Sequence, residues 1–149
     1  APSGFPVKQE YRRVTQHRIR TAAGDVVRYL RYREEGEALD KRKQRNGISP
    51  NFVHSLDAAA LVQSVNRAKE RGVRDFMVVH DSYGVPAADA PAMARTLREV
   101  YAELFSRPLL DTFREQVQRA CPPGVELPPV PDTGDLDTSL VLQSEYFFA

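Results

Sequence analysis

Cysteine and long apolar stretches are what this sequence has least of. The single cysteine, Cys121, excludes a disulfide within the chain and fits a reducing compartment such as the cytoplasm. No apolar run is long enough to cross a bilayer, and no signal peptide opens the chain. An initiator methionine is also missing, and because the first residues read like the middle of a protein, we expect a C-terminal fragment.

Net charge is small as well, but the charges are unevenly distributed. The 149 residues are 42% hydrophobic and 28% charged with a net charge of +1, which is typical of a soluble globular domain. Residues 1–47 hold twelve Lys and Arg against six Asp and Glu, whereas residues 48–149 hold nine against fourteen. This asymmetry indicates a basic arm that meets a polyanion, with a merely solvated basic face as the alternative.

Two segments are expected, residues 1–48 and residues 49–149. The first contains a predicted two-stranded ribbon over about residues 8–33, because strand-forming residues lie on both sides of a turn signal at residues 22–25. Neither strand has a clean apolar face, so the ribbon cannot bury a core. An isolated hairpin of this kind is marginal in water, and we expect it to order against a partner.

Arginines give the ribbon a candidate function. Arg18 and Arg20 share one face of the first strand, whereas Arg28 and Arg31 take opposite faces of the second. A two-stranded ribbon fits the major groove of DNA, where arginine can bind O6 and N7 of guanine. Some of these arginines can instead contact only phosphates, which gives affinity without sequence choice.

Two helices are predicted after the ribbon. A charged helix over residues 34–45 ends at Gly47, and a second helix begins with Ser49 as its N-cap and Pro50 in its first turn. Gly72 ends the second helix. Its buried stripe is predicted from apolar residues at helical spacing, namely Phe52, Val53, Leu56, Ala60, Leu61, Val65 and Ala68.

A polar stripe lies on another side of that second helix. Asn51, His54 and Asp57 fall on it, given about 100° of rotation per residue. A histidine in the first turn of a helix is more often structural than functional. Asp57 can orient His54 from one turn away or be an ordinary surface carboxylate.

The candidate catalytic element is a predicted hairpin over about residues 75–86. Its apolar run predicts a buried strand, and Gly84 offers the positive φ of a tight turn before a strand returning at Val85. An aspartate at the tip of a rigid hairpin, here Asp81, can be placed as accurately as metal-assisted phosphoryl transfer requires. An aspartate that only caps its own turn is the alternative.

The remaining chain is predicted to be mostly helical. Helices are expected over residues 89–106 and 109–120, followed by an extended proline-rich stretch over residues 122–134. A last short helix from about Leu136 leads to the aromatic tail, residues 146–149. We expect the tail to dock, because three consecutive aromatic side chains are costly to leave in water.

Several motifs together resemble the bacteriophage-type single-subunit RNA polymerases. The matching stretches are Gly4-Phe5-Pro6-Val7, Pro50-Asn51-Phe52-Val53-His54-Ser55, Val79-His80-Asp81-Ser82 and the terminal Phe147-Phe148-Ala149. Related DNA polymerases typically carry Glu where this chain has Ser82. The resemblance implies an α+β fold that forms the C-terminal part of a right-hand polymerase, its palm and fingers. It would have a catalytic β-hairpin, packed helices and a protruding β-ribbon.

The same resemblance implies roles for individual residues in RNA synthesis with two Mg²⁺ ions. Asp81 would be the catalytic, metal-binding carboxylate, His80 would contact the RNA 3′ end, and His54 would lie in the minor groove of the RNA–template duplex. Promoter DNA would be read by Arg18, Arg20, Arg28 and Arg31. The family also needs a second metal-binding aspartate, a triphosphate-binding lysine and a ribose-selecting tyrosine. No segment here matches these, so the chain alone should be inactive.

The implied partners are template and promoter DNA, nascent RNA, ribonucleoside triphosphates and the upstream part of the polymerase, with no membrane. A phage enzyme would work in the cytoplasm of an infected bacterium, and the mitochondrial matrix is the alternative location. Three other functions stay open: a subunit of a naturally split polymerase, a related DNA polymerase, and a stand-alone DNA-binding module.

Overall fold

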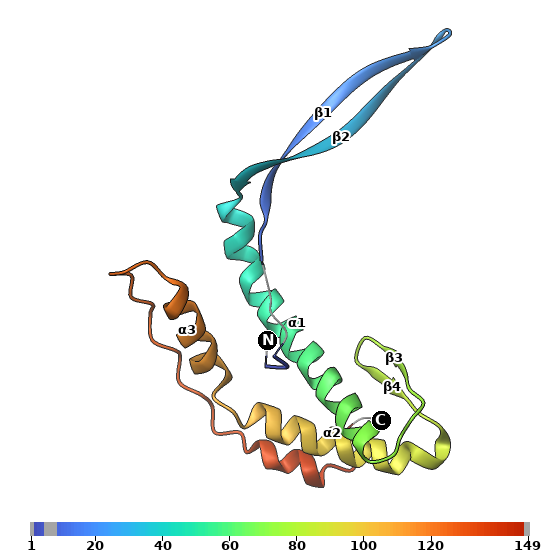
Figure 1. Ribbon diagram of the computed structural model, residues 1–149, viewed down its shortest axis with the longest axis vertical. Helices are drawn as coiled ribbons and strands as arrows, with labels where there is room; N and C mark the ends of the chain where they lie inside the picture. Colours follow the sequence, from blue (N-terminus) through green and yellow to red (C-terminus); the bar gives the residue numbers. More distant parts are fainter. Residues whose placement is uncertain (1, 5–8, 148–149) are drawn as a thin grey trace. The chain divides into compact units, whose positions relative to one another are not determined.

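The computed structural model describes residues 2–4 and 9–147. Its main elements are β1 Arg12–Ala23, β2 Val26–Leu39, α1 Lys41–Glu70, β3 Met77–Val79, β4 Ser82–Gly84, α2 Ala90–Phe105 and α3 Leu109–Ala120 (Figure 1). Two short 3₁₀ helices follow β4 and α3, η1 at Ala87–Asp89 and η2 at Thr138–Gln143. Helices and two small antiparallel sheets are thus mixed, which is compatible with the expected α+β class.

The chain divides into two compact units inside α1, between Ser55 and Leu56. The first unit holds the ribbon and the beginning of α1, and the second holds the rest of α1 and the elements after it. Of the predicted motifs, residues 5–8 and the terminal residues 148–149 lie outside the described residues.

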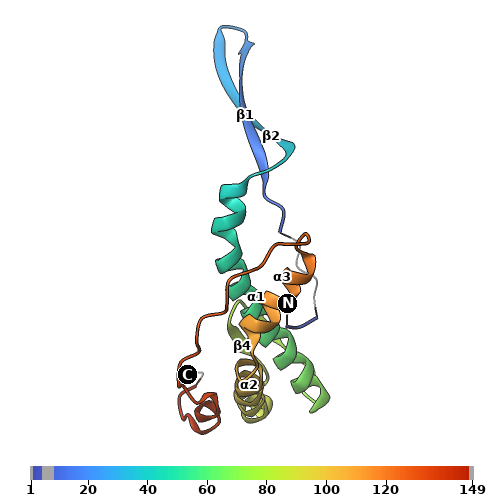
Figure 2. The same cartoon turned by 90° about the vertical axis from the view of Figure 1, so that its left-hand side faces the viewer.

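The ribbon forms as predicted but is longer. β1 and β2 pair antiparallel on either side of a two-residue turn whose Gly24 has a φ of 61°, and both figures show a long twisted ribbon (Figures 1 and 2). Every residue of β2 is exposed along its whole length. The helix predicted over residues 34–45 is wrong in its first half, because residues 34–39 continue β2 and Leu39 pairs with Arg12.

A single helix replaces the two that the sequence predicts. α1 begins after Asp40, whose Oδ1 accepts hydrogen bonds from the backbone amides of Arg42 and Lys43 at 3.1 and 3.0 Å. It then continues through Gly47 and Pro50 to Glu70. The predicted helix end at Gly47 and the predicted N-cap at Ser49 are therefore both wrong.

Contacts from the chain before β1 explain this continuity. Gln9 and Gln44 exchange side-chain hydrogen bonds, and the Asn51 amide donates to Gln9 Oε1 at 2.8 Å and to the Tyr11 hydroxyl at 2.9 Å. A Cβ on Gly47 would lie 2.5 Å from Cε2 of the Tyr11 ring, so glycine is needed here for close packing and not to end the helix. These tertiary contacts lie on both sides of Pro50 and override the local stop signals.

The core of the second unit lies between α1 and α2. One buried cluster contains Ala68, Val73, Met93 and Leu97, and a second contains Ala59, Ala60 and Leu104. Tyr101 packs against both clusters. Gly72, with a φ of 99°, ends α1 as predicted.

Ion pairs reinforce the same helix pair at its surface. Arg67 Nη2 lies 2.6 Å from Glu103 Oε2, and Arg107 Nη2 lies 2.5 Å from the other oxygen of Glu103. One turn away on both helices, Arg71 pairs with Glu99. The Arg67–Glu103 and Arg71–Glu99 pairs join α1 to α2, whereas Arg107 pairs with Glu103 from the residues just after α2.

The predicted helices over residues 89–106 and 109–120 are confirmed as α2 and α3. The C-terminal segment lies along α2, where Arg98 donates to the carbonyl oxygens of Ser144 and Glu145 at 3.0 and 3.2 Å. Phe147 docks edge-on against Tyr101 with ring centroids 5.2 Å apart, whereas Tyr146 stays 76% exposed. Among the described residues, no helix is both long and apolar enough to cross a membrane.

Candidate active site and nucleic-acid interface

His80 and Asp81 form the two-residue turn of the second hairpin. Val79 pairs with Ser82 directly before and after them, and β3 and β4 are each only three residues long. His80 has a φ of 54°, and among the residues that the structure describes it is the only one other than glycine with a positive φ. Such a conformation costs about 1–3 kcal/mol and collects at functional sites, where surrounding structure maintains it.

The predicted position of this turn needs correction. Gly84 does not supply the positive φ, because it lies inside β4 opposite Met77, and β4 already begins at Ser82 instead of at Val85. A Cβ on Gly84 would lie 3.3 Å from the Met77 carbonyl oxygen and 3.4 Å from Met77 Cβ. A Cβ here would need its neighbours to move by a few tenths of an ångström, so glycine favours the close approach of the two strands.

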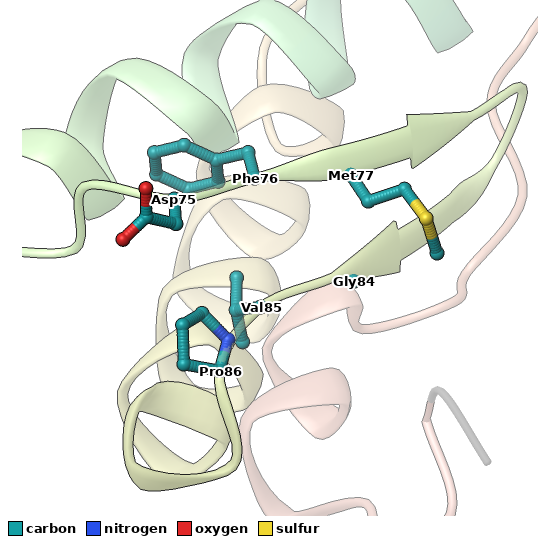
Figure 3. Close-up of a pocket in the computed structure, with 6 residues that line it drawn as sticks. All are labelled: Asp75, Phe76, Met77, Gly84, Val85 and Pro86. Carbon is teal, nitrogen blue, oxygen red and sulfur yellow. The ribbon is translucent and has the colours of Figure 1, made fainter.

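The expectation of a buried strand is also wrong. Met77 is 70% exposed and Val79 is 57% exposed, so one face of β3 is open. At the open end of the hairpin, six residues line a shallow hollow of about 300 Å³, shown in Figure 3: Asp75, Phe76, Met77, Gly84, Val85 and Pro86. The hairpin thus presents its tip and one face outward and packs only through the other face.

That packed face contains a pair of tyrosines. Tyr83, in the middle of β4, packs against the cluster of Ala68, Val73, Met93 and Leu97, together with Tyr101 of α2. Burial raises the pKa of Tyr83 above its ordinary value, and Tyr101 adds to the rise.

Two carboxylates act on the same tyrosine pair. Burial raises the pKa of Tyr101 overall, and the negative charges of Asp57 and Asp81 contribute to the rise. Both tyrosines therefore stay protonated at neutral pH. Asp57 is exposed on α1, as expected of a surface carboxylate, and its negative charge also raises the pKa of Tyr83 in the hairpin that carries Asp81.

Asp81 itself is suited to supply one carboxylate ligand of a metal site. Its side chain is exposed at the hairpin tip, and no ion pair occupies it among the described residues. Mg²⁺ prefers carboxylate oxygens and retained waters. Within residues 2–4 and 9–147, no three His, Cys, Asp or Glu side chains gather closely enough to hold a metal. The residues present therefore fit one carboxylate of such a site.

The ribbon brings three of the four predicted arginines together. Arg18 pairs directly with Arg31, and Arg20 pairs with Tyr29, so these side chains share one face. Arg33, opposite Gln16, extends the same face. We call the set Arg18, Arg20, Arg31 and Arg33 the arginine face.

The fourth predicted arginine is not part of this face. Arg28 pairs with Thr21, one residue out of step with Arg20, and therefore projects to the opposite side of the ribbon. On that side His17 stacks on Tyr32 with ring centroids 4.8 Å apart and lies 2.8 Å from Glu34. On the arginine face the Arg18 guanidinium covers the Tyr29 ring at 3.9 Å from its centroid.

Comparison with known proteins is decisive for the family. A family model described as DNA-dependent RNA polymerase matches residues 1–124. This chain belongs to the phage-type single-subunit DNA-dependent RNA polymerases. The resemblance inferred from the sequence motifs is thereby confirmed.

Several curated relatives of this polymerase chain are plant proteins. "DNA-directed RNA polymerase 3B, chloroplastic" from Nicotiana tabacum is 40% identical over 147 residues, which cover 99% of this chain and 14% of the relative. "DNA-directed RNA polymerase 1, mitochondrial" from Nicotiana sylvestris is 38% identical with the same coverage. "DNA-directed RNA polymerase 1A" from Nicotiana tabacum is also 38% identical, and 91% of it is covered. The chain thus spans about a seventh of the first two relatives.

These names do not support the expected phage origin or the cytoplasm of a bacterial host, because the relatives are named as chloroplastic or mitochondrial. That expectation depended on the Phe147-Phe148-Ala149 ending and on overall similarity to the family. These features identify the family without identifying the compartment.

The polymerase site residues do not all lie in one compact unit. His80 and Asp81 share a turn in the second unit, whereas the arginine face and His54 belong to the first. His54 is exposed on α1. Asn51, from the same predicted stripe, is engaged by Gln9 and Tyr11.

Two features escaped the sequence interpretation. Strand alternation alone places Arg31 and Arg33 on one face of the second strand, but the pairing of that face with Arg18 and Arg20 was missed and could have been found, since a two-residue turn at Gly24 and Asp25 fixes which residues pair. The Tyr83–Tyr101 pair could not, because Tyr101 has the spacing of an ordinary core residue of α2. Its hydroxyl becomes notable only when the hairpin packs on the helix.

Proposed function

We propose that this chain is the part of an RNA polymerase that carries one catalytic carboxylate and a DNA-binding ribbon. The observation that carries the proposal is the His80–Asp81 turn, a strained two-residue turn at the tip of a hairpin, in a chain of this family. In right-hand polymerase terms, residues 49–149 form part of the palm and residues 1–48 lie on the fingers side.

Asp81 acts as a metal ligand in nucleotide addition. Together with an aspartate from the upstream part of the polymerase, Asp81 would hold two Mg²⁺ ions, which would supply charge stabilisation for an in-line phosphoryl transfer. The RNA 3′-oxygen bonds to the α-phosphorus of the incoming nucleotide as the bond to pyrophosphate breaks. His80, adjacent in the same turn, contacts the RNA 3′ end, and His54 donates to the minor groove of the RNA–template duplex.

The ribbon binds promoter DNA through its arginine face. Arg18 and Arg31 lie directly opposite each other, an arrangement that is repulsive in the free protein and favourable against a polyanion. Because Arg20 extends the same face, three guanidinium groups can enter one groove together. Arg28, on the other side, contacts phosphates and contributes affinity without sequence choice.

The partners follow from this function. They are promoter and template DNA, nascent RNA, ribonucleoside triphosphates and the upstream part of the polymerase. RNA synthesis takes place in an organelle, a mitochondrion or a chloroplast, as the names of the relatives suggest.

Promoter-dependent RNA synthesis with Mg²⁺ tests the proposal. The chain alone should be inactive, and the polymerase that contains it, from the same gene, should be active. Asp81→Ala should lower synthesis by on the order of a thousandfold and leave promoter binding unchanged. Full activity in Asp81→Ala, with DNA still bound, would favour the stand-alone DNA-binding module instead.

A further inference from the structure

Arg98, which is half-buried on α2, binds backbone oxygens with every nitrogen of its guanidinium group. Its Nε donates to the carbonyl oxygen of Ser144 at 3.0 Å, and its Nη2 donates to that of Glu145 at 3.2 Å. Its Nη1 donates to the carbonyl oxygen of Ala94, one turn earlier in α2, at 3.0 Å. One side chain therefore joins the C-terminal segment to a helix that precedes it by more than 40 residues.

This arrangement fixes two consecutive peptide groups in both position and orientation. A guanidinium group is planar and presents its N–H groups in a fixed fork, which the ammonium group of lysine does not reproduce. Residues 144–147 belong to no helix or strand, because η2 ends at Gln143. Figures 1 and 2 both show this part of the chain beside α2. Arg98 therefore fixes the path of the chain after η2.

The segment that Arg98 holds ends against Tyr101 of α2. Phe147 docks edge-on against the Tyr101 ring with centroids 5.2 Å apart, and Phe105 contacts the same ring at 5.6 Å. A ring with two aromatic partners has less rotational freedom than one that faces water. Tyr101 in turn packs against the buried cluster of Ala68, Val73, Met93 and Leu97.

The hairpin that carries Asp81 packs on the same cluster. It has three cross-strand pairs, and a two-stranded hairpin is marginal in water by itself. Its contacts with the cluster come from Phe76, Tyr83 and Val85. Figure 3 shows the two strands passing across α2. The position of Asp81 thus depends on how this surface of α2 is packed, and Tyr101 is where the C-terminal segment reaches it.

We propose that Arg98 is a positioning residue for nucleotide addition. By holding the C-terminal segment on α2, it keeps Phe147 against Tyr101 and so keeps the hairpin that carries Asp81 in place. This inference rests on the function proposed above. Arg98 acts through the packing of Tyr101 and not on the reacting atoms.

Removing the guanidinium group from the intact polymerase tests the inference, with rates measured well below the Tm of each variant. Arg98→Ala should lower kcat for nucleotide addition by about tenfold, with KM for nucleotides nearly unchanged. The Mg²⁺ concentration for half-maximal activity should rise. Backbone amides of residues 144–147 and of residues 77–84 should exchange with deuterium faster. Arg98→Lys, which keeps the charge but loses the fork, should have an intermediate effect.

Arg114 of α3 offers a matched control. Its Nε donates to the carbonyl oxygen of Pro128 at 2.8 Å, and its Nη2 donates to that of Leu127 at 2.9 Å. Arg114→Ala therefore removes the same kind of contact from another part of the C-terminal segment. It should speed amide exchange in residues 125–128 and leave kcat and the Mg²⁺ requirement unchanged. An equal loss of kcat in Arg114→Ala would overturn the inference, since any loosening of the C-terminal segment would then suffice.

A double variant shows whether Arg98 acts through the aromatic contact. Phe147→Ala should lower kcat about as much as Arg98→Ala, and the two changes together should cost no more than one alone. Losses that multiply would overturn the inference, as would unchanged kcat or unchanged exchange of residues 77–84 in Arg98→Ala. A lower Tm with unaltered kcat and Mg²⁺ requirement would also overturn it. If Arg98→Ala does not fold, Arg98→Lys with Phe147→Ala provides the same comparison.

Asp81→Asn separates the two proposals. If it abolishes synthesis while Arg98→Ala remains fully active, the proposed function stands and the positioning inference fails. If Asp81→Asn leaves synthesis intact, the proposed function itself fails.

Discussion

The two hairpins of this polymerase chain are built on the same local plan and differ in what holds them. Both are antiparallel and both close with a two-residue turn that contains a positive φ. In the ribbon that φ belongs to Gly24, which adopts it without strain, and β2 is exposed along its length. In the short hairpin it belongs to His80, and Tyr83 anchors the strands on a buried cluster.

The two hairpins therefore meet different requirements: the ribbon must have affinity for DNA, and the short hairpin must place a carboxylate accurately. The ribbon offers a long charged face whose order can come from the DNA that it binds. The short hairpin must instead place one carboxylate accurately before any ligand arrives, because misplacement by about 1 Å can cost a hundredfold in rate. The same substitution should therefore have unequal effects in the two hairpins.

Introducing valine at a strand glycine should give the largest difference. Gly84→Val places a branched side chain where even a Cβ lies 3.3 Å from the Met77 carbonyl, so the strands must shift. We expect synthesis to fall by about a hundredfold with promoter binding unchanged. Gly36→Val in β2 is the matched control, because its Cβ would meet only the Arg13 carbonyl at 3.5 Å. Equal losses in both would show that the short hairpin has no special need for accuracy.

Arginine substitutions on the two sides of the ribbon should give the next largest effect. Arg18→Ala or Arg31→Ala should weaken promoter binding by about tenfold relative to unrelated DNA, because both lie on the arginine face. Arg28→Ala should weaken binding to both DNAs equally and reduce the slope of log K against log salt by about one. Equilibrium binding at several salt concentrations measures both. An equal loss of discrimination in Arg28→Ala would contradict the division into faces.

The sequence was informative wherever a pattern was local. Apolar spacing predicted α2 and α3 well, and residues 22–25 predicted the ribbon turn. Gly47 and Pro50 misled the interpretation of α1, since both are ordinary stop signals that contacts from Gln9 and Tyr11 override.

The candidate site shows the same limit. Asp81 could be singled out because the motif is contiguous, and Arg18 and Arg20 because strand alternation is regular. Gly84 was assigned to the turn because a glycine's flexibility and its small size look identical in a sequence. Tyr83 and Tyr101 pack against the same buried cluster only through tertiary folding, so no local pattern reveals that they share it.

A smaller effect is expected at the ribbon turn. Gly24→Ala requires alanine at a φ of 61° with no neighbour within 4 Å, so strain of about 1 kcal/mol is the whole effect. Hydrogen exchange should become faster in β1 and β2 and stay unchanged in β3 and β4. Gly24→Asn should be nearly neutral, because asparagine tolerates this conformation. If Gly24→Asn loosens the ribbon as much as alanine does, backbone strain is the wrong explanation.

The smallest effect should come from the ion pairs below the short hairpin. Hydrogen bonds from Arg67 and Arg107 lower the pKa of Glu103 from its ordinary value of 4.5. A lowered folded-state pKa stabilises the fold above the unfolded value, and this stability is lost as pH falls through the folded value. Because Glu103 is half exposed, Glu103→Gln should cost less than about 1 kcal/mol at pH 7.

Urea denaturation of wild type and Glu103→Gln over a range of pH measures this difference. It should disappear at acid pH, where Glu103 is protonated in both states, and shrink in high salt at pH 7. A Glu103→Gln cost that persists below the lowered pKa would point to lost packing instead of lost charge. Since α1 and α2 carry the short hairpin but not the ribbon's pairing, any loosening should appear in the amides of residues 77–84 before those of β1 and β2.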